Sequence, residues 1–408
     1  MRTVFTGGLV FDGTGSDPHP ADLVIEDGRI IDVGTDLDGD VAVDCAQRTV
    51  LPGMFDCHVH LLVNGLDPSG VRRRPFSLAF FEAAANMRAT LATGITTVRE
   101  AGGSDLGVQE AQRRGLAAGP RMQIAITMLT QTGGHGDPWE PSGASSPLFP
   151  PHPGKPSGIV DGPDEVRRKV RELIRAGANV IKVATSGGVA SPRDDPRHGH
   201  FRDAEVAVMV EEATAAGLGV MAHAQATEGI QVAVRNGVRS IEHGIYLDDE
   251  TISMMLDRGT WLVPTLMAPR GVLDAAASGA DLAPSVVAKA HMVSQAHADS
   301  ARRAIAAGVR VAMGTDSGVT PHGRNLDELP LLVQAGMSPG QALCAATGSA
   351  AELMGLQAEL GTIEPGKRAD LVIVDGDALE VATLADRVLA VYQDGELVVD
   401  NTGRKPES

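Results

Sequence analysis

Gly-Met-Phe-Asp-Cys-His-Val-His, residues 53–60, is the stretch that decides how this chain folds. Its short apolar run opens with a glycine and leads into two histidines, His58 and His60, which is typical of a buried parallel strand with a polar end. Side chains alternate along an extended strand, so both imidazoles point to the same side and can chelate one ion together. A lone His-x-His pair also occurs in cores and on surfaces, so the interpretation depends on other segments.

Four other short apolar runs end in a polar side chain of the same kind. Asn-Val-Ile-Lys (179–182), Val-Met-Ala-His (220–223), Ser-Ile-Glu-His (240–243) and Ala-Met-Gly-Thr-Asp (312–316) end in Lys182, His223, His243 and Asp316. Metal-competent residues at the carboxyl ends of several strands are typical of a barrel active site. Four imidazoles, one carboxylate and one lysine can hold two divalent metal ions.

The central part of the chain alternates strand-like and helix-like segments. The strand candidates are residues 53–57, 96–98, 122–127, 180–184, 219–222, 240–242, 260–264 and 309–313. Helical stretches separate most of them, and several end in a glycine, a common helix cap. Eight such units predict an α/β fold, the (β/α)8 or TIM barrel. A doubly wound sheet is the alternative, but it gathers residues from many strands at one mouth less easily.

Both ends of the chain are rich in strand signals. Ala-Asp-Leu-Val-Ile-Glu-Asp-Gly (21–28) resembles Ala-Asp-Leu-Val-Ile-Val-Asp-Gly (369–376), and the pairs Asp27-Gly28 and Asp394-Gly395 each stand between apolar runs. Asp-Gly in this setting predicts a β-hairpin. We therefore expect residues 1–52 and 357–408 to form one small β-sandwich that flanks a barrel domain of residues 53–356.

Composition narrows the class of protein. Of 408 residues, 43% are hydrophobic but only two are Trp, two Tyr and eight Phe, so the core must be aliphatic. The formal charge of −17 argues against nucleic acid or an anionic membrane as a partner. Three widely spaced cysteines suggest no disulfide framework, and no signal or membrane segment is evident. A cytoplasmic protein is expected.

Lys182 lies inside Val-Ile-Lys-Val-Ala, where an ammonium would be buried at considerable cost. A buried salt bridge is one interpretation. The other is a modified lysine, because nearby metal ions lower the pKa of the amine and the neutral amine can add carbon dioxide. The carbamate so formed on Lys182 has two oxygens and can bridge two metals.

The remaining candidates complete such a site. His223 and His243 would hold the second metal, although each alone could be a core histidine. The carboxylate of Asp316 can touch a metal and accept the proton of a bridging water, whose pKa a divalent metal lowers to ~7. This combination predicts hydrolysis of an amide or ester.

With these motifs, the chain resembles the amidohydrolase superfamily, and within it the imidazolonepropionase-like group that includes bacterial Xaa-Pro dipeptidases (prolidases) and related metallo-carboxypeptidases. The resemblance covers nearly the whole chain. It implies a binuclear zinc site with a carboxylated lysine on the six residues, a split β-sandwich and often a homo-oligomer. Besides residues 53–60, its motifs are Gly-Ile-Thr-Thr-Val-Arg-Glu (94–100), Thr-Gly-Gly-His-Gly-Asp (132–137), Ile-Lys-Val-Ala-Thr-Ser-Gly-Gly (181–188), Ala-His-Ala (222–224), Ile-Glu-His-Gly (241–244), Gly-Thr-Asp-Ser (314–317) and Leu-Gly-Thr-Ile-Glu-Pro-Gly-Lys-Arg-Ala-Asp-Leu (360–371).

The substrate pocket is less clearly marked. In the family, the histidine that matches His135 contacts the substrate carbonyl or carboxylate; here it lies in the proline-rich segment 129–163, typical of a lid or binding loop, and could instead order that loop. Gln225 stands where relatives often have Tyr or His, and Glu100 where Asp is common. Tyr246 is another pocket candidate. Basic loop residues that could bind a substrate carboxylate are Arg193, Arg197, His198, His200, Arg202, Arg270 and Arg324.

Three functions remain open from the sequence. The leading one is a cytoplasmic zinc amidohydrolase whose small substrate carries a free carboxylate, such as an Xaa-Pro-like dipeptide or an N-acyl amino acid. The second is ring opening of a cyclic amide or imidazolone-type substrate; deamination is disfavoured because deaminases of the superfamily usually lack a bridging lysine. The third is a non-enzymatic assembly protein, which the complete ligand set disfavours.

Overall fold

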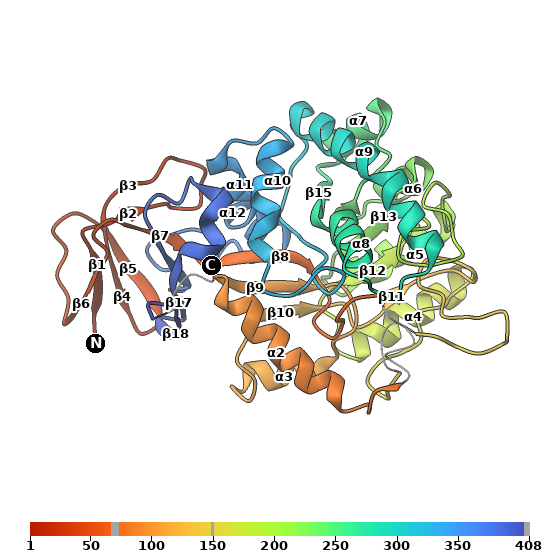
Figure 1. The fold of residues 1–408 in the computed structure, drawn as a ribbon, viewed down its shortest axis with the longest axis horizontal. Coiled ribbons are helices and arrows are strands. Elements are labelled where there is room, and N and C mark those ends of the chain that lie inside the picture. The colour runs from red at the N-terminus through yellow and green to blue at the C-terminus, as the bar shows by residue number, and fades with distance from the viewer. Residues whose placement is uncertain (67–72, 148–150, 404–408) are drawn as a thin grey trace.

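The computed structural model describes residues 1–66, 73–147 and 151–403, and its middle part is a set of parallel strands covered by helices (Figure 1). A first sheet has the order β10-β9-β8, and a second has the order β11-β12-β13-β14-β15. All neighbouring pairs in both sheets are parallel. The strands are β8 (Met54–Val59), β9 (Ile95–Glu100), β10 (Arg121–Ile124), β11 (Met128–Leu129), β12 (Ile181–Ala184), β13 (Val220–Ala224), β14 (Ser240–His243) and β15 (Trp261–Val263).

One segment without regular strand structure joins the two sheets. Val311 forms a parallel bridge with Leu262 of β15, and Ser317 forms one with Val59 of β8. The prediction of a regular strand over residues 309–313 is therefore wrong. This segment pairs with its neighbours only through single bridges.

A second expected strand is divided. Residues 122–127 were expected to be continuous, but Ile126 has a φ of 67°, in the left-handed region that interrupts an extended strand. The chain pairs with β9 before this residue and with β12 after it.

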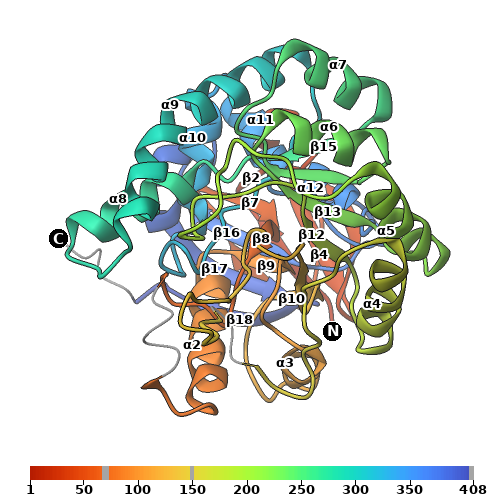
Figure 2. The ribbon, with the colours of Figure 1, turned by 90° about the vertical axis from the view of Figure 1, so that its right-hand side faces the viewer.

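Helices surround these strands, as the view along the strands in Figure 2 shows. Every residue of β8, β9, β12, β13 and β14 is buried, which is the pattern of parallel strands covered on both faces. The helices are α2 (Leu78–Ala92), α3 (Leu106–Arg113), α4 (Pro163–Arg175), α5 (Asp203–Ala215), α6 (Thr227–Arg235), α7 (Asp249–Arg258), α8 (Met267–Ala277), α9 (Pro284–Ala307), α10 (Glu328–Gln334), α11 (Pro339–Ala345), α12 (Gly348–Leu353) and the 3-10 turns η1 (Asn325–Asp327) and η2 (Val381–Arg387).

Strands from both chain ends form two further sheets. The six-stranded sheet has the order β18-β17-β16-β7-β2-β3, in which Leu371 of β16 lies opposite Pro52 of β7, and the four-stranded sheet has the order β5-β4-β1-β6. One apolar cluster, with Phe5 and Leu23 from one sheet and Val50 from the other, joins them. The strands are β1 (Thr3–Thr6), β2 (Leu9–Val10), β3 (His19–Pro20), β4 (Asp22–Glu26), β5 (Arg29–Gly34), β6 (Val41–Asp44), β7 (Arg48–Pro52), β16 (Leu371–Asp375), β17 (Val388–Gln393) and β18 (Glu396–Asp400).

Both predicted Asp-Gly hairpins are confirmed. Asp27 and Gly28 have φ of 50° and 77°, and Asp394 and Gly395 have φ of 49° and 77°, as a tight primed turn requires. The two turns touch, since a Cβ on Gly28 would lie 2.9 Å from the carbonyl oxygen of Asp394. The two predicted hairpin turns, one from each end of the chain, therefore pack against each other.

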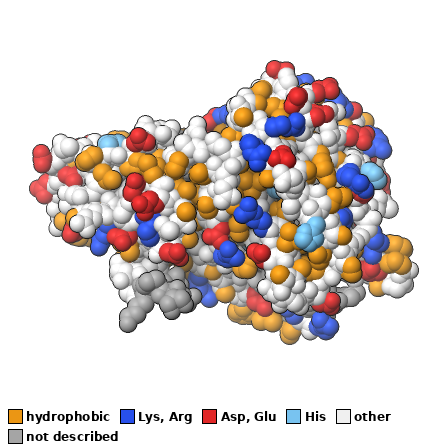
Figure 3. Space-filling model, turned by 45° about the horizontal axis from the view of Figure 1, so that its top comes forward, with side chains coloured by type: hydrophobic (Ala, Val, Ile, Leu, Met, Phe, Trp, Pro, Cys, Tyr) orange, Lys and Arg blue, Asp and Glu red, His pale blue; other side chains and the backbone are white. Residues whose placement is uncertain are grey.

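The surface carries both signs of charge. On the face drawn in Figure 3, acidic and basic side chains are interspersed. In the part of the chain that the structure describes, no helix has the length and apolar character needed to cross a membrane.

Candidate metal centre

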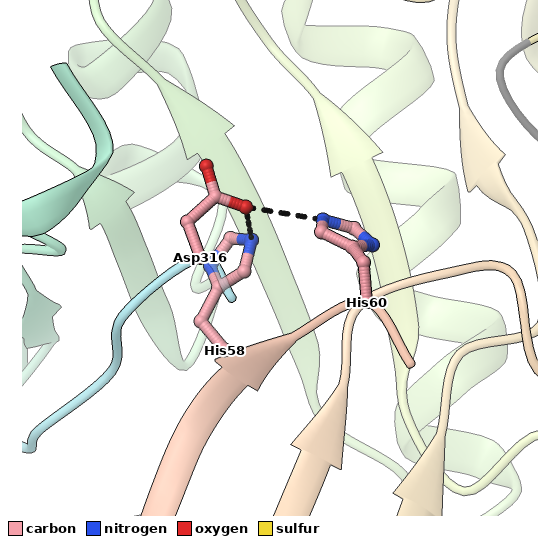
Figure 4. A group of neighbouring side chains, drawn as sticks. All are labelled: His58, His60 and Asp316. Carbon is pink, nitrogen blue, oxygen red and sulfur yellow. Dashed lines mark ion pairs between the residues drawn. The ribbon is translucent and has the colours of Figure 1, made fainter. Parts of the chain in front are cut away.

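Among the described residues, His58, His60 and Asp316 form a compact group of possible ligand side chains (Figure 4). The two histidines lie at the carboxyl end of β8, and Asp316 lies on the segment that joins the sheets. Oδ1 of Asp316 is 3.5 Å from Nε2 of His58 and 3.3 Å from Nε2 of His60. One ligand atom from each of the three residues lies within 4.8 Å of the others, close enough to share one ion.

The other three candidate ligands adjoin this group. Nζ of Lys182, on β12, lies 3.4 Å from Nε2 of His58. The ring of His243 at the end of β14 is centred 5.2 Å from that of His58 and 4.7 Å from that of His223 on β13. The structure therefore brings all six residues to one place, where the two central sheets meet.

Each of the four imidazoles has one ring nitrogen bonded to an acceptor elsewhere in the protein. Metal-bound histidines commonly hold such an outer partner, which sets the tautomer and leaves the opposite nitrogen for the metal. The residues therefore fit a metal centre. The pairs are His58 Nδ1 with Glu242 Oε2 at 2.8 Å, His60 Nδ1 with Gly102 O at 2.8 Å, His243 Nδ1 with Thr265 Oγ1 at 2.7 Å and His223 Nε2 with Gly187 O at 3.2 Å.

The electrostatics keep most of these groups in their ligand forms. His60 is the exception: burial alone would lower its pKa, but the hydrogen bond and the negative charge of Asp316 raise it. Burial lowers the pKa of His58 and His223 well below the usual value and that of His243 to about 3, so the three rings are neutral near pH 7. Burial also lowers the pKa of Lys182 to about 8, which leaves an appreciable fraction of neutral amine. Burial alone would raise the pKa of Asp316, but the neighbouring imidazoles hold it well below its usual range.

A buried ion pair between Arg99 and Glu242 orients the His58 ring, because Glu242 also accepts from His58 Nδ1. Arg99 of β9 donates through Nη2 to Glu242 Oε1 at 2.9 Å, and Ser240 donates to the same oxygen at 2.5 Å. Glu242 is fully buried and accepts from His58 with its other oxygen. Sequence patterns mark neither Arg99 nor Glu242 as a site residue; the signal that points to both is a charged side chain inside a buried strand.

His135 lies on the loop after β11 and reaches the cluster. Its ring stacks on that of His223, with centroids 4.2 Å apart and planes 10° from parallel. Nδ1 of His135 lies 2.8 Å from Oδ2 of Asp194, on the loop after β12, and Lys289 of α9 donates to Oδ1 of Asp194 at 3.0 Å. Gly188 permits this packing, because a Cβ there would lie 2.3 Å from the His135 ring. Asp194 carries no sequence signal that separates it from other loop acids.

A cavity of about 720 Å³ opens over the cluster. Both long loops, 129–163 and 185–202, contribute to its walls. Gln225, which is 4% exposed, lines the cavity, and its Oε1 has no hydrogen-bond partner within the described residues. Tyr246 is half-buried beside the cavity rather than among its lining residues. Glu100 is buried and accepts from the backbone N–H of Gly102, whose carbonyl orients His60.

A model of the amidohydrolase family matches residues 49–398. The chain belongs to this family. Its members generally use divalent metals and act on amide or other C–N bonds, so the chain is an enzyme of that hydrolase class.

Known proteins make the resemblance more specific. An ochratoxinase of Aspergillus niger is 35% identical over 402 residues, which cover 93% of this chain and 82% of that protein. The solved structure of a Xaa-Pro dipeptidase with methionine bound in its active site is 33% identical, with a TM-score of 0.89 and coverage of 97% and 99%. That of a prolidase complexed with N-methylphosphonate-L-proline is 36% identical, with a TM-score of 0.89 and coverage of 98% and 100%. The resemblance to prolidase-like amidohydrolases is confirmed.

Proposed function

We propose that this chain is a binuclear zinc amidohydrolase that hydrolyses the amide bond of a dipeptide, Xaa-Pro-like, or of an N-acyl amino acid. The observation that carries the proposal is the convergence of four imidazoles, Asp316 and Lys182 beneath one cavity. His58, His60 and Asp316 would hold one ion, and His223 and His243 the other. Lys182, as a carbamate, would contribute one oxygen to each.

The chain's own residues then have separate tasks. Two divalent ions bound here would supply Lewis acidity and a water of lowered pKa. Asp316, which is ionised, takes the proton of the attacking water and transfers it to the leaving nitrogen, so that the C–N bond breaks to a carboxylate and an amine. His135 presents Nε2 to the substrate carbonyl or carboxylate, because Asp194 occupies its Nδ1. The walls of the long loops limit access of bulk water.

We also propose that the two central sheets are one closed (β/α)8 barrel, with domain limits at 52/53 and 356/357. The bridges Leu262–Val311 and Val59–Ser317 support closure on one side. On the other side, β11 follows β10 after only three residues. The six-stranded sheet, which combines strands from both chain ends, supports the domain limits.

The test is a substrate screen on purified, zinc-loaded protein. Dipeptides, N-acyl amino acids and cyclic amides are offered in parallel, and Asp316→Asn serves as the inactive control. We expect turnover of linear amides that carry a free carboxylate. Turnover confined to cyclic amides would replace the proposal with ring opening, and activity retained in Asp316→Asn would contradict the mechanism.

A further inference from the structure

Asp56 is a buried carboxylate that links the two segments carrying the ligands of the first candidate ion. It lies on β8, two residues before His58, and none of its surface is exposed. Its Oδ1 accepts from the backbone N–H of His58 and from that of Thr315, both at 3.1 Å. Thr315 directly precedes Asp316, so one carboxylate oxygen joins a candidate ligand to the neighbour of another.

The second oxygen of Asp56 is bonded to two side chains. Oδ2 accepts from Thr315 Oγ1 at 2.6 Å and from Nδ2 of Asn325, the first residue of η1, at 2.8 Å. Thr315 Oγ1 in turn accepts from the backbone N–H of Ser317 at 3.1 Å. These four residues are each no more than 1% exposed, so solvent does not compete for their hydrogen bonds.

Regular strand pairing is weak where Asp56 acts. The segment that carries Asp316 is joined to β8 by the single bridge between Val59 and Ser317 and by isolated backbone hydrogen bonds, such as Asp316 N–H to His58 O at 2.8 Å. The His58 and Asp316 side chains nevertheless face each other (Figure 4), with Nε2 and Oδ1 3.5 Å apart. The carboxylate of Asp56 supplies cross-links that an ordinary ladder would otherwise provide.

The negative charge of Asp56 is surrounded by neutral donors. Two backbone N–H groups, one hydroxyl and one amide donate to it, whereas the nearby Glu242 pairs with Arg99. Burial raises the pKa of Asp56 to about 6, which leaves it largely ionised at pH 7. A buried charge without an opposite charge beside it is costly. Divalent ions held by the adjoining His58 and Asp316 would offset it.

We propose that Asp56 is a positioning residue that holds His58 and Asp316 at the spacing one ion needs and whose negative charge strengthens zinc binding. Asn325 contributes only through Asp56. This inference rests on the metal centre of the proposed function and is independent of the substrate.

The test measures zinc release to a chromogenic chelator, together with melting temperatures with and without zinc. Asp56→Asn removes the charge, and the fold should persist because Oδ1 of Asn325 has no partner among the described residues and can accept from the new amide once the Asn325 side chain turns. We expect zinc retention to weaken by about 10- to 100-fold and the zinc-dependent rise in melting temperature to shrink. Asn325→Leu keeps the charge but removes one donor, so retention should fall by about threefold to tenfold.

Glu328→Gln is the matched control. Glu328 is as fully buried as Asp56 and also accepts two backbone N–H groups, those of Leu266 at 2.7 Å and Met267 at 2.8 Å, neither of which adjoins a candidate ligand. Its variant should release zinc at the wild-type rate, whatever its effect on stability.

The outcomes separate positioning from support of the fold. Unchanged zinc retention in Asp56→Asn, or an equal loss in Glu328→Gln, overturns the proposal, and so does a lower melting temperature of the metal-free variant without faster release. If Asp56→Asn does not fold, Asn325→Leu decides by the same measurement. A wild type that binds zinc but hydrolyses no amide defeats the proposed substrate class and leaves this test intact, whereas a wild type that binds no zinc overturns both.

Discussion

Replacing Asp194 by asparagine should impair catalysis without disturbing the metals. Within the described residues, the Asp194 side chain forms hydrogen bonds or ion pairs with His135, Lys289 and the Gly188 N–H, and with none of the six candidate ligands; its Oδ2 lies 2.8 Å from Nδ1 of His135. The substitution keeps the size of the side chain but removes the negative charge that fixes the His135 tautomer. His135 would then sample ring orientations and tautomers in which Nε2 no longer presents a proton to the substrate.

The size of the effect follows from the contacts that are lost and kept. A buried hydrogen bond to a charged group contributes about 1.5–3 kcal/mol, and 1.4 kcal/mol is tenfold in rate, so kcat/KM should fall by about 10- to 100-fold. The Asp194 side chain is only 2% exposed, so solvent screens the pair little. The loop itself should stay in place, because Lys289 also donates to the carbonyls of Gly188 at 2.7 Å and Asp194 at 2.9 Å.

The assay is steady-state kinetics on the best amide from the screen, with zinc content measured in parallel. Asp195→Asn is the matched control: Asp195 is the next residue, pairs with Arg197 at 2.6 Å and is 26% exposed. The double variant with His135→Ala should be no slower than His135→Ala alone, because both changes remove the same function. Wild-type kcat/KM in Asp194→Asn, an equal loss in Asp195→Asn, or additive losses would refute the reasoning.

Three further predictions concern the metal ions and the ion pair between Arg121 of β10 and Asp370, the residue before β16. Zinc-supplemented protein should contain two metal ions per chain by elemental analysis, and Lys182→Ala should abolish activity, with partial recovery in added short carboxylic acids; one ion with full activity would contradict the bridge. Glu242→Gln should weaken zinc retention against a chelator by about 10- to 100-fold, since it removes the carboxylate behind His58, and unchanged retention would refute that support. Arg121→Gln leaves the carboxylate of Asp370, only 2% exposed, without its ion-pair partner and should destabilise the fold by about 3–5 kcal/mol in urea unfolding. The control Arg302→Gln breaks an exposed pair with Asp299 and should cost no more than about 1 kcal/mol; equal effects would contradict this assignment.

Residues at strand ends could be located from the sequence because two independent signals coincide there. Apolar runs mark the strands, and parallel strands in one α/β domain bring their carboxyl ends together, so His58, Lys182 and His243 could be expected side by side. The Asp-Gly pairs were equally informative, because few residues other than glycine adopt positive φ readily. At the strand ends and at the Asp-Gly turns, the local sequence pattern alone is therefore enough to predict where the residue lies in the fold.

The loops carry no such pattern. The contact between His135 and Asp194 spans 59 positions, and Lys289 comes from a helix 95 positions further along the chain. No periodicity links residues at such separations, so Asp194 could not be chosen over other loop residues. The break at Ile126 was missed for a related reason: an isoleucine in an apolar run predicts a strand, and only the surrounding packing holds it in a left-handed conformation.

Backbone strain adds an argument for function that is independent of the ligand geometry. His243 and Asp316 have φ of 70° and 60°, in the left-handed region, which costs a residue with a Cβ about 1–2 kcal/mol. Such strain persists only where the surroundings impose it, and it clusters at functional sites. Here the backbone N–H of Asp316 donates to His58 O at 2.8 Å, and Thr265 holds the His243 ring at 2.7 Å. Asparagine adopts this conformation more readily than most residues, so Asp316→Asn should keep the fold. A loss of turnover in that variant would then report the missing carboxylate rather than a collapsed site.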